Sequence, residues 1–129
     1  MAKFNQFEVW RVELPVQEVV RKWDGKTINV NGTEMHSGHR CVVVAADPDG
    51  QWAVIIPLTS AQYGSNGGEK WANPKKTWVR VIHDGKPAYA LTEQIRYADS
   101  GRFFEKEGEL GQFDQQQVEL KLRALLGHI

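Results

Sequence analysis

The chain has 129 residues, of which 41% are hydrophobic and 25% charged, a composition typical of one globular domain spanning residues 1–129. It contains no apolar run near the ~18 residues that span a bilayer, and its first residues lack the apolar core of a signal peptide, so we expect a cytoplasmic protein without a membrane partner. Its 16 basic and 16 acidic residues cancel, which argues against binding long duplex nucleic acid by phosphate neutralisation alone but leaves room for a local cationic cleft that holds a few nucleotides.

The N-terminal region predicts one strand and one projecting hairpin. Residues 8–14 alternate in the manner of a half-buried strand, which Pro15 ends. Farther on, Asn31 and Gly32 stand between the β-favouring residues of segment 26–35, and Asn-Gly is the strongest short hairpin signal. We therefore predict a β-ribbon that projects from the domain.

The centre of the chain contains two continuous apolar runs, residues 41–46 and 53–58, separated by the turn-forming sequence Asp-Pro-Asp-Gly at residues 47–50. Continuous apolar runs suit strands that are covered on both faces, so we predict a central antiparallel hairpin. The single cysteine, Cys41, excludes an internal disulfide framework, and its place at the head of a valine run predicts a small buried side chain.

The next segments complete a β-rich pattern. Residues 61–74 have no hydrophobic period and several turn-forming residues, which predicts a surface loop. Residues 77–82 and 88–91 predict two strands around a turn at residues 83–86, and several short strands at this spacing indicate a small barrel. Residues 100–106 predict one helical turn. The acidic residues that we expect to form a solvated face are Glu105, Glu107 and Glu109.

One C-terminal helix is predicted to begin at Asp114, which can cap the first turn together with Gln117 three residues on. Phe113 can pack against Val118 as a hydrophobic staple, and Gly127 supplies the stop signal. The apolar stripe of this helix predicts that it packs against the barrel.

Four segments in a particular order carry a resemblance to a known family. They are Phe-Glu-Val-Trp-Arg-Val-Glu-Leu at residues 7–14, Gly-His-Arg-Cys-Val-Val-Val at 38–44, Val-Ile-Ile-Pro-Leu-Thr-Ser at 54–60, and Tyr-Ala-Leu-Thr-Glu-Gln-Ile-Arg-Tyr-Ala-Asp at 89–99. With the terminal helix that ends in Leu-Gly, these segments resemble the MazF/PemK (Kid-like) family of toxin endoribonucleases over nearly the whole chain. The sequence departs from the family pattern at Phe7, where glycine is usual, at Cys41, where proline is usual, and in a longer insert at residues 20–37.

The resemblance implies a mainly β fold with a minor α component: a small SH3-like antiparallel β-barrel with a projecting β-ribbon and a C-terminal packing helix. It implies a sequence-selective, metal-independent endoribonuclease that cleaves single-stranded RNA (mRNA) and uses no cofactor. It also implies a homodimer that is inhibited by a cognate antitoxin protein, a partner that folds as it binds.

Three residues are predicted to be catalytic by this resemblance: Arg40, Thr59 and Glu93. Metal-free RNA cleavage needs a base for the 2′-hydroxyl proton, donors for the charge on the phosphate, and an acid for the leaving 5′-oxygen. Because a guanidinium is a poor acid at neutral pH, Arg40 suits the role of phosphate clamp, with Thr59 as a phosphate donor and Glu93 as the base. The competing interpretations are a surface ion pair for Arg40 and a strand-end cap for Thr59.

Supporting contacts to RNA are predicted for Ser60, Gln94 and Arg96. Ser60 follows Thr59 at the strand end, and Gln94 and Arg96 lie directly after Glu93. An internal salt bridge between Arg96 and Asp99 is an equally good interpretation of that segment.

A second group of predicted RNA contacts combines aromatic and basic residues. Trp71 and the two lysines Lys75 and Lys76 suit stacking and phosphate contact along a single strand, although tryptophans more often pack in a core or a dimer interface. His39 is predicted to lie near the cleft as a proton carrier, with a solvated histidine as the plainer interpretation. His36 and His39 lie three residues apart, but without a third ligand the sequence predicts no metal site.

Two alternatives to an endoribonuclease remain at this stage. The first is a non-catalytic toxin-like binding protein on the same barrel, similar to the relatives that poison gyrase through the terminal helix. Those relatives end in an aromatic residue, whereas this chain ends Leu-Gly-His-Ile. The second is a repurposed homologue, in keeping with Cys41 and the long insert at residues 20–37.

Overall fold

A computed structural model of the chain describes residues 3–14, 18–29, 37–60 and 76–127. Nine strands, two short 3-10 helices and one α-helix are assigned in these residues. In chain order they are β1 (Glu8–Leu14), β2 (Glu18–Val20), β3 (Thr27–Asn29), β4 (Ser37–Ala46), β5 (Trp52–Ser60), β6 (Trp78–His83), β7 (Lys86–Leu91), η1 (Thr92–Gln94), β8 (Arg96–Asp99), η2 (Ser100–Arg102), β9 (Phe103–Glu109) and α1 (Gln112–Leu125).

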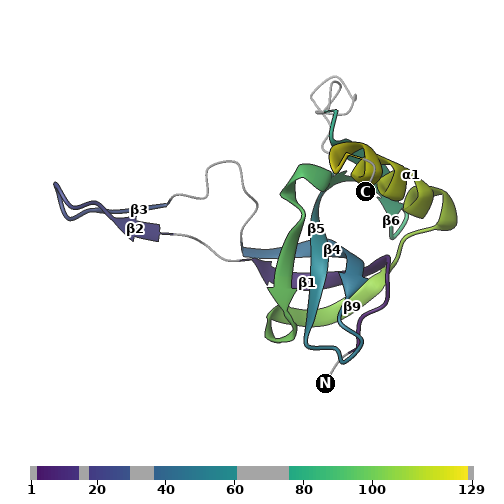
Figure 1. Cartoon of the computed structure of the whole chain (residues 1–129), viewed down its shortest axis with the longest axis horizontal. Coiled ribbons are helices and arrows are strands. Elements are labelled where there is room, and N and C mark those ends of the chain that lie inside the picture. The colour runs from purple at the N-terminus through teal and green to yellow at the C-terminus, as the bar shows by residue number, and fades with distance from the viewer. Residues whose placement is uncertain (1–2, 15–17, 30–36, 61–75, 128–129) are drawn as a thin grey trace.

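Seven of the strands form one curled antiparallel sheet in the order β6-β7-β5-β4-β1-β9, with β8 beside β5. The curl depends on β5, which changes partner along its length: Trp52 to Ile55 pair with β8, whereas Leu58 to Ser60 pair with β7. The sheet therefore closes into a half-barrel, and α1 lies beside β6 at one end of it (Figure 1). This architecture confirms the prediction of a mainly β barrel with a C-terminal packing helix.

The central strands are buried on both faces, as the continuous apolar runs predicted. Val42 and Ile56, which pair across β4 and β5, belong to the core beneath α1 together with Val118 of the helix. The neighbouring Cys41 and Ile55 belong to a second core on the opposite face of the sheet. Because β-strand side chains alternate between faces, one hairpin supplies both cores.

Cys41 is fully buried, so the prediction of a small buried side chain is confirmed. Burial raises the pKa of its thiol from 9.0 to about 12, although the charges of Arg96 and Arg11 favour the thiolate. The thiol therefore stays protonated at neutral pH and serves as core packing.

Phe7 adopts a left-handed backbone conformation with a φ of 68°. This conformation costs a non-glycine residue roughly 1–2 kcal/mol, which explains why glycine is usual at this position in the resembled family. The position is held from both sides, since the Phe7 amide donates to the Val43 carbonyl and its carbonyl accepts from the Leu110 amide. Burial of the phenyl ring in the core beneath α1 offsets the strain.

The two-stranded ribbon of β2 and β3 forms a sheet of its own and lies apart from the barrel in Figure 1. Its described turn spans Arg21 to Lys26, where the Arg21 amide donates to the Lys26 carbonyl and the Arg21 side chain pairs with Asp24. Trp23 at this turn is 79% exposed, with the Arg21 guanidinium stacked on its ring. The predicted Asn31-Gly32 hairpin lies outside the described residues.

The turn between β6 and β7 is a two-residue Asp84-Gly85 connection in which both residues have positive φ. Such a turn matches the twist of the flanking strands and brings His83 directly opposite Lys86. β6 is thus shifted by one residue from the predicted 77–82, and His83 ends the strand instead of starting the turn.

The prediction of one helical turn over residues 100–106 is half wrong. A 3-10 turn spans Ser100–Arg102, but Phe103–Glu109 forms β9 against β1. In that ladder Val9 pairs with Gly108 and Trp10 with Lys106, so Glu107 is the extra residue of a β-bulge. Glu105 and Glu109 are exposed, as predicted, whereas the bulge turns the partly buried Glu107 toward Arg11.

The helix begins two residues before its predicted start. Gly111 is the N-cap and Gln112 the first helical residue, so Asp114 lies inside the first turn. Its carboxylate accepts a hydrogen bond from the Ile82 amide, which ties the helix to β6. Phe113 is 71% exposed, so the predicted staple to Val118 is also wrong. Within the described part of the chain, no helix combines the length and apolar character needed to cross a bilayer.

Glu8 gives the fold a pH-dependent anchor. Burial alone would raise its pKa, but hydrogen bonds from the Asn5 backbone, Lys106, Trp10 and the Asn5 side chain together lower it from 4.5 to about 2. Because the folded pKa is depressed, this carboxylate stabilises the protein above about pH 4.5, and the contribution is lost as the pH falls from 4.5 toward 2.

We therefore expect Glu8→Gln to lower the free energy of unfolding at neutral pH by on the order of 2 kcal/mol, after allowance for the half-exposed Lys106. The difference between variant and wild type should shrink between about pH 4.5 and 2. Urea unfolding at several pH values measures it, with Glu105→Gln on the exposed side of β9 as the control. A Glu8→Gln penalty that does not change with pH would contradict the assignment.

Candidate functional site

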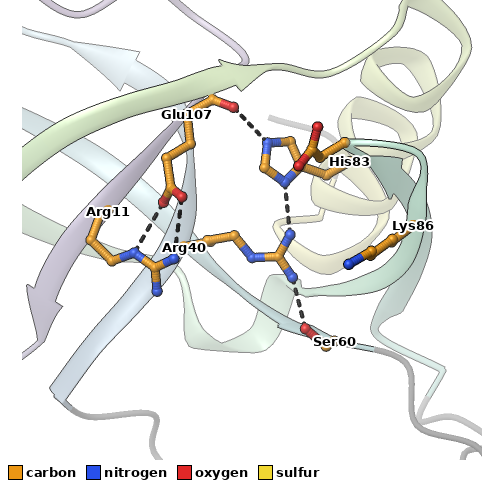
Figure 2. A pocket seen from close by; sticks show the side chains of 7 residues that line it. Arg11, Arg40, Ser60, His83, Lys86 and Glu107 are labelled. Atoms are coloured by element: carbon orange, nitrogen blue, oxygen red, sulfur yellow. Dashed lines mark hydrogen bonds and ion pairs between the residues drawn. The ribbon is translucent and has the colours of Figure 1, made fainter.

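A polar pocket of about 340 Å³ opens where β4, β5 and β6 each contribute a polar side chain. Its volume is at the small end of the range for ligand sites. The residues that line it are Arg11, Arg40, Ser60, His83, Asp84, Lys86 and Glu107 (Figure 2).

The Arg40 guanidinium is the centre of this pocket. Its Nη2 donates to Ser60 Oγ at 2.8 Å, and its Nη1 lies 2.7 Å from His83 Nδ1. Arg40, Ser60 and His83 come from three different strands, so the guanidinium joins β4 to the ends of β5 and β6 (Figure 2). The pairing of Arg40 with Arg11 across β4 and β1 places a second guanidinium beside it.

The two arginines differ in how their charge is compensated. Arg11 pairs with Glu107, with Nε 3.0 Å from Oε2 and Nη2 donating to Oε1 at 3.2 Å. Both hydrogen bonds described for the Arg40 guanidinium go to uncharged groups, the Ser60 hydroxyl and the His83 ring. With a neutral His83, the three cationic and two acidic side chains of the lining leave one net positive charge. The pocket therefore presents a positive charge without a carboxylate bound to it, which suits an anion.

The structure brings Ser60, and not Thr59, to Arg40. Ser60 and Thr59 are consecutive residues on β5, and consecutive side chains of a strand leave on opposite faces. Thr59 is partly buried and pairs with Tyr89 of β7, and it does not line the pocket.

The structure does not bring Glu93 to the pocket. Its carboxylate accepts hydrogen bonds from Thr77 Oγ1 at 2.8 Å and Trp78 Nε1 at 2.9 Å. These contacts lie at the Trp78 end of β6, whereas Arg40 contacts the His83 end, five residues or roughly 16 Å away along the strand. The arrangement favours a structural role for Glu93, which joins η1 to the start of β6.

We therefore expect Glu93→Ala to lower the free energy of unfolding by about 1–2 kcal/mol, because two side-chain hydrogen bonds are lost. Glu93→Gln should retain the RNA cleavage that the resemblance implies within about threefold, because the amide oxygen keeps one of these bonds. Thermal unfolding and initial cleavage rates measure both effects. Loss of a general base lowers the rate by about 10²- to 10⁴-fold. A loss of that size in Glu93→Gln, with normal stability, would show that Glu93 is catalytic.

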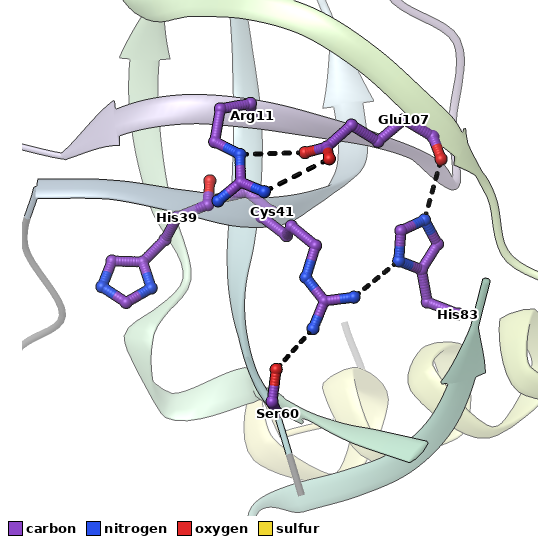
Figure 3. Close-up of polar contacts among 7 residues, drawn as sticks. Arg11, His39, Cys41, Ser60, His83 and Glu107 are labelled. Carbon is purple, nitrogen blue, oxygen red and sulfur yellow. Dashed lines mark hydrogen bonds and ion pairs between the residues drawn. The ribbon is translucent and has the colours of Figure 1, made fainter. Parts of the chain in front are cut away.

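The remaining predicted contacts are spread over the barrel. The Gln94 amide oxygen accepts from Arg96 Nη2 at 3.2 Å, so these two side chains join each other. Asp99 accepts from the Tyr97 hydroxyl, and no described contact joins it to Arg96. The His39 imidazole points away from the chain of contacts between Ser60 and His83 (Figure 3).

Of the predicted aromatic and basic group, Lys76 is the member that lies within the described residues. Lys76 is exposed just before β6, while Trp71 and Lys75 lie outside the described residues, as does the predicted loop at 61–74.

His83 and Glu107 are pocket residues that the sequence did not predict. A signal for His83 was present, because Val79, Val81 and His83 follow the period of two that places all three on the buried face of β6. The signal for Glu107 was the Glu-Gly step inside β9, since an isolated glycine in a strand often marks a bulge.

Comparison with solved structures finds the same fold in a known protein. It is similar to an endoribonuclease in complex with its cognate antitoxin from a mycobacterial species, with a TM-score of 0.60 and 13% identity over 95% of this chain and 93% of that chain. Residues 5–126 match the family model of the PemK-like, MazF-like toxin of type II toxin-antitoxin systems. The chain therefore belongs to the PemK/MazF toxin family. A search of curated protein sequences gave no match.

Proposed function

We propose that this protein is a toxin endoribonuclease that cleaves single-stranded RNA in the cytoplasm, at selected sequences and without a metal ion, and that a cognate antitoxin inhibits it. Membership of the PemK/MazF toxin family supports the proposal. The description of the similar mycobacterial protein, an endoribonuclease in complex with its antitoxin, supports both the activity and the kind of partner.

One observation carries the proposal: the Arg40 guanidinium faces the pocket with hydrogen bonds to uncharged groups alone among the described residues. A planar guanidinium binds a phosphodiester through two N–H groups at once. Lys86, whose amine points to the same space in Figure 2, adds a second positive charge. The pocket thus matches the anion that RNA presents at every nucleotide.

In the proposed reaction the ribose 2′-oxygen attacks phosphorus and the bond from phosphorus to the 5′-oxygen breaks. The 2′-hydroxyl proton passes to a base, and the leaving 5′-oxygen takes a proton from solvent water. The products are a 2′,3′-cyclic phosphate and a 5′-hydroxyl end. Arg40 neutralises the charge that grows on the phosphate oxygens, a contribution that is typically worth several kcal/mol in a preorganised site.

The roles of the two neighbouring hydroxyls can be separated. In this proposal Ser60 orients Arg40 through its hydrogen bond to the guanidinium. The resemblance predicts that Thr59 contacts the phosphate, and this contact requires RNA binding to bring the Thr59 hydroxyl to the pocket. Comparison of Ser60→Ala, Thr59→Ala and Thr59→Ser at saturating RNA distinguishes the two. A loss in Thr59→Ala that Thr59→Ser restores supports a hydroxyl contact by Thr59.

The decisive experiment is incubation of the purified protein with a long single-stranded RNA in the presence of EDTA, followed by mapping of the ends. We expect a limited set of cuts with 2′,3′-cyclic phosphate and 5′-hydroxyl termini. Intact RNA at high protein concentration would favour a non-catalytic binding protein on the same barrel. Cleavage that EDTA abolishes would reject the metal-free reaction.

The proposed homodimer is tested separately. Light scattering on the eluting protein should give about twice the chain mass of 14.6 kDa. A mass equal to one chain across the concentration range would reject the dimer without affecting the proposed chemistry.

A further inference from the structure

His83 is a buried histidine with both ring nitrogens engaged. It ends β6, is only 5% exposed, and borders the pocket. Its Nδ1 lies 2.7 Å from Arg40 Nη1, and its Nε2 lies 2.9 Å from the Glu107 backbone carbonyl oxygen (Figure 3). A chain of contacts thus runs from the bulge in β9 through the imidazole to the guanidinium.

The partners determine which nitrogen carries the proton. A backbone carbonyl only accepts hydrogen bonds, so Nε2 must be the donor toward Glu107. A guanidinium only donates, so Nδ1 must present its lone pair to Arg40. The neutral ring with its proton on Nε2 satisfies both contacts. A doubly protonated ring would set an N–H against an N–H at Arg40.

The ring is held in this orientation by the bulge. The bulged Glu107 turns its carbonyl out of the β1 ladder and toward the imidazole. The next residue, Gly108, has no side chain, and a Cβ there would lie 3.4 Å from His83 Nε2. The close approach of Gly108 leaves the imidazole little room to swing away from Arg40 on that side.

The charged groups near His83 come from several elements. Arg40 comes from β4, Asp84 from the turn and Lys86 from the start of β7. Asp114 of α1 accepts a hydrogen bond from the amide of the adjacent Ile82. Arg11 of β1 is paired with the Glu107 carboxylate of β9. No carboxylate is hydrogen-bonded to the ring among the described residues, so a positive charge on His83 would face the Arg40 guanidinium directly.

We propose that His83 is a positioning residue of this site: in its neutral form it holds the Arg40 guanidinium toward the phosphate, and its protonation releases Arg40 and switches the site off. The proposal rests on the proposed function, because it assigns Arg40 to the scissile phosphate. Histidine is the side-chain type whose ordinary change of charge falls between pH 5 and 8, so the test covers that range.

The test compares His83→Asn, His83→Ala and wild type for kcat and KM from pH 5 to 8. Wild-type kcat/KM should fall by about tenfold per pH unit at the acidic end, as expected for one essential deprotonated group. The Asn oxygen can accept a hydrogen bond from Arg40 but does not titrate. His83→Asn should therefore keep most of the activity at pH 8 and should not show the fall in kcat/KM at acidic pH, which we call the acidic limb. His83→Ala should lose about 10²-fold in kcat, because the guanidinium is no longer oriented. Glu105→Gln, which changes an exposed titratable side chain of β9 outside the pocket, is the control and should keep the acidic limb.

Two measurements separate this inference from the proposed function. Long-range ¹H–¹⁵N spectra of the imidazole report the tautomer without any activity, and a proton on Nδ1 at neutral pH would overturn the inference. If wild type does not cleave RNA, its affinity for a 2′-O-methyl oligoribonucleotide still reports whether Arg40 is oriented to bind a phosphate. That affinity should weaken at acidic pH in wild type and not in His83→Asn. An acidic limb that is the same in wild type and His83→Asn would overturn the inference while leaving the nuclease assignment intact.

Discussion

Arg40→Ala is expected to lower kcat/KM for RNA cleavage by about 10²- to 10³-fold, the usual effect of removing a preorganised donor from a developing anion. The loss should appear mainly in kcat, because the contact strengthens as charge moves onto the phosphate oxygens. The fold should persist, since the guanidinium contributes only two side-chain hydrogen bonds, to Ser60 and His83, worth about 1 kcal/mol each. Initial rates on a short RNA that contains one mapped cleavage site measure the effect.

Two companion variants sharpen this prediction. Arg40→Lys keeps the charge but loses the planar fork that reaches Ser60 and His83 together, so we expect an activity between those of Arg40→Ala and wild type. Arg123→Ala removes an exposed arginine of α1 that pairs with Glu119, and we expect wild-type cleavage. An equal loss of cleavage activity in the Arg40→Ala and Arg123→Ala variants would mean that the arginines act only by attracting RNA through their positive charge. Unchanged cleavage in Arg40→Ala would remove the pocket as the active site.

The largest effect on stability is expected for Ile56→Ala, at about 2–5 kcal/mol. Ile56 is fully buried beneath α1 and pairs with Val42 across the two central strands, so the lost methyl groups leave a cavity that the rigid sheet closes only in part. A loss of this size is a large fraction of the total stability of a domain. Urea unfolding followed by tryptophan fluorescence measures it.

Ile82 provides the matched control, because the same substitution is made on an exposed side chain of β6. Ile82 is 45% exposed, and its tie to the helix uses only its backbone amide. We expect Ile82→Ala to change the free energy of unfolding by less than about 0.5 kcal/mol. Similar losses in both alanine variants would contradict the core assignment of Ile56.

The central strands were the easiest part of the fold to predict, because their signal is local. Runs such as residues 41–46 and 53–58 can lie only where both faces are covered, and they form β4 and β5. The change of partner along β5 is not a local property. It depends on where β7 and β8 meet the strand.

The sequence predicted the site residue that a local pattern marks and missed the residues whose position depends on how the strands pair. Arg40 precedes a valine run and lies in the pocket. Glu93 has a suitable chemistry and a suitable place in the chain, yet the register of β6 takes it to the Trp78 end and brings His83 to Arg40 instead. Glu107 enters the pocket only through a one-residue bulge, which reverses the face that simple alternation assigns.

The buried, protonated thiol of Cys41 makes the chain a ready scaffold for single-site labelling. It is the only cysteine in the sequence, and a maleimide reacts with an exposed thiolate, which Cys41 does not offer at neutral pH. A cysteine introduced by Trp23→Cys at the exposed tip of the ribbon would therefore take a fluorophore alone. Energy transfer from that dye to a labelled oligonucleotide or antitoxin peptide would report docking on the native protein, without first removing the natural cysteine.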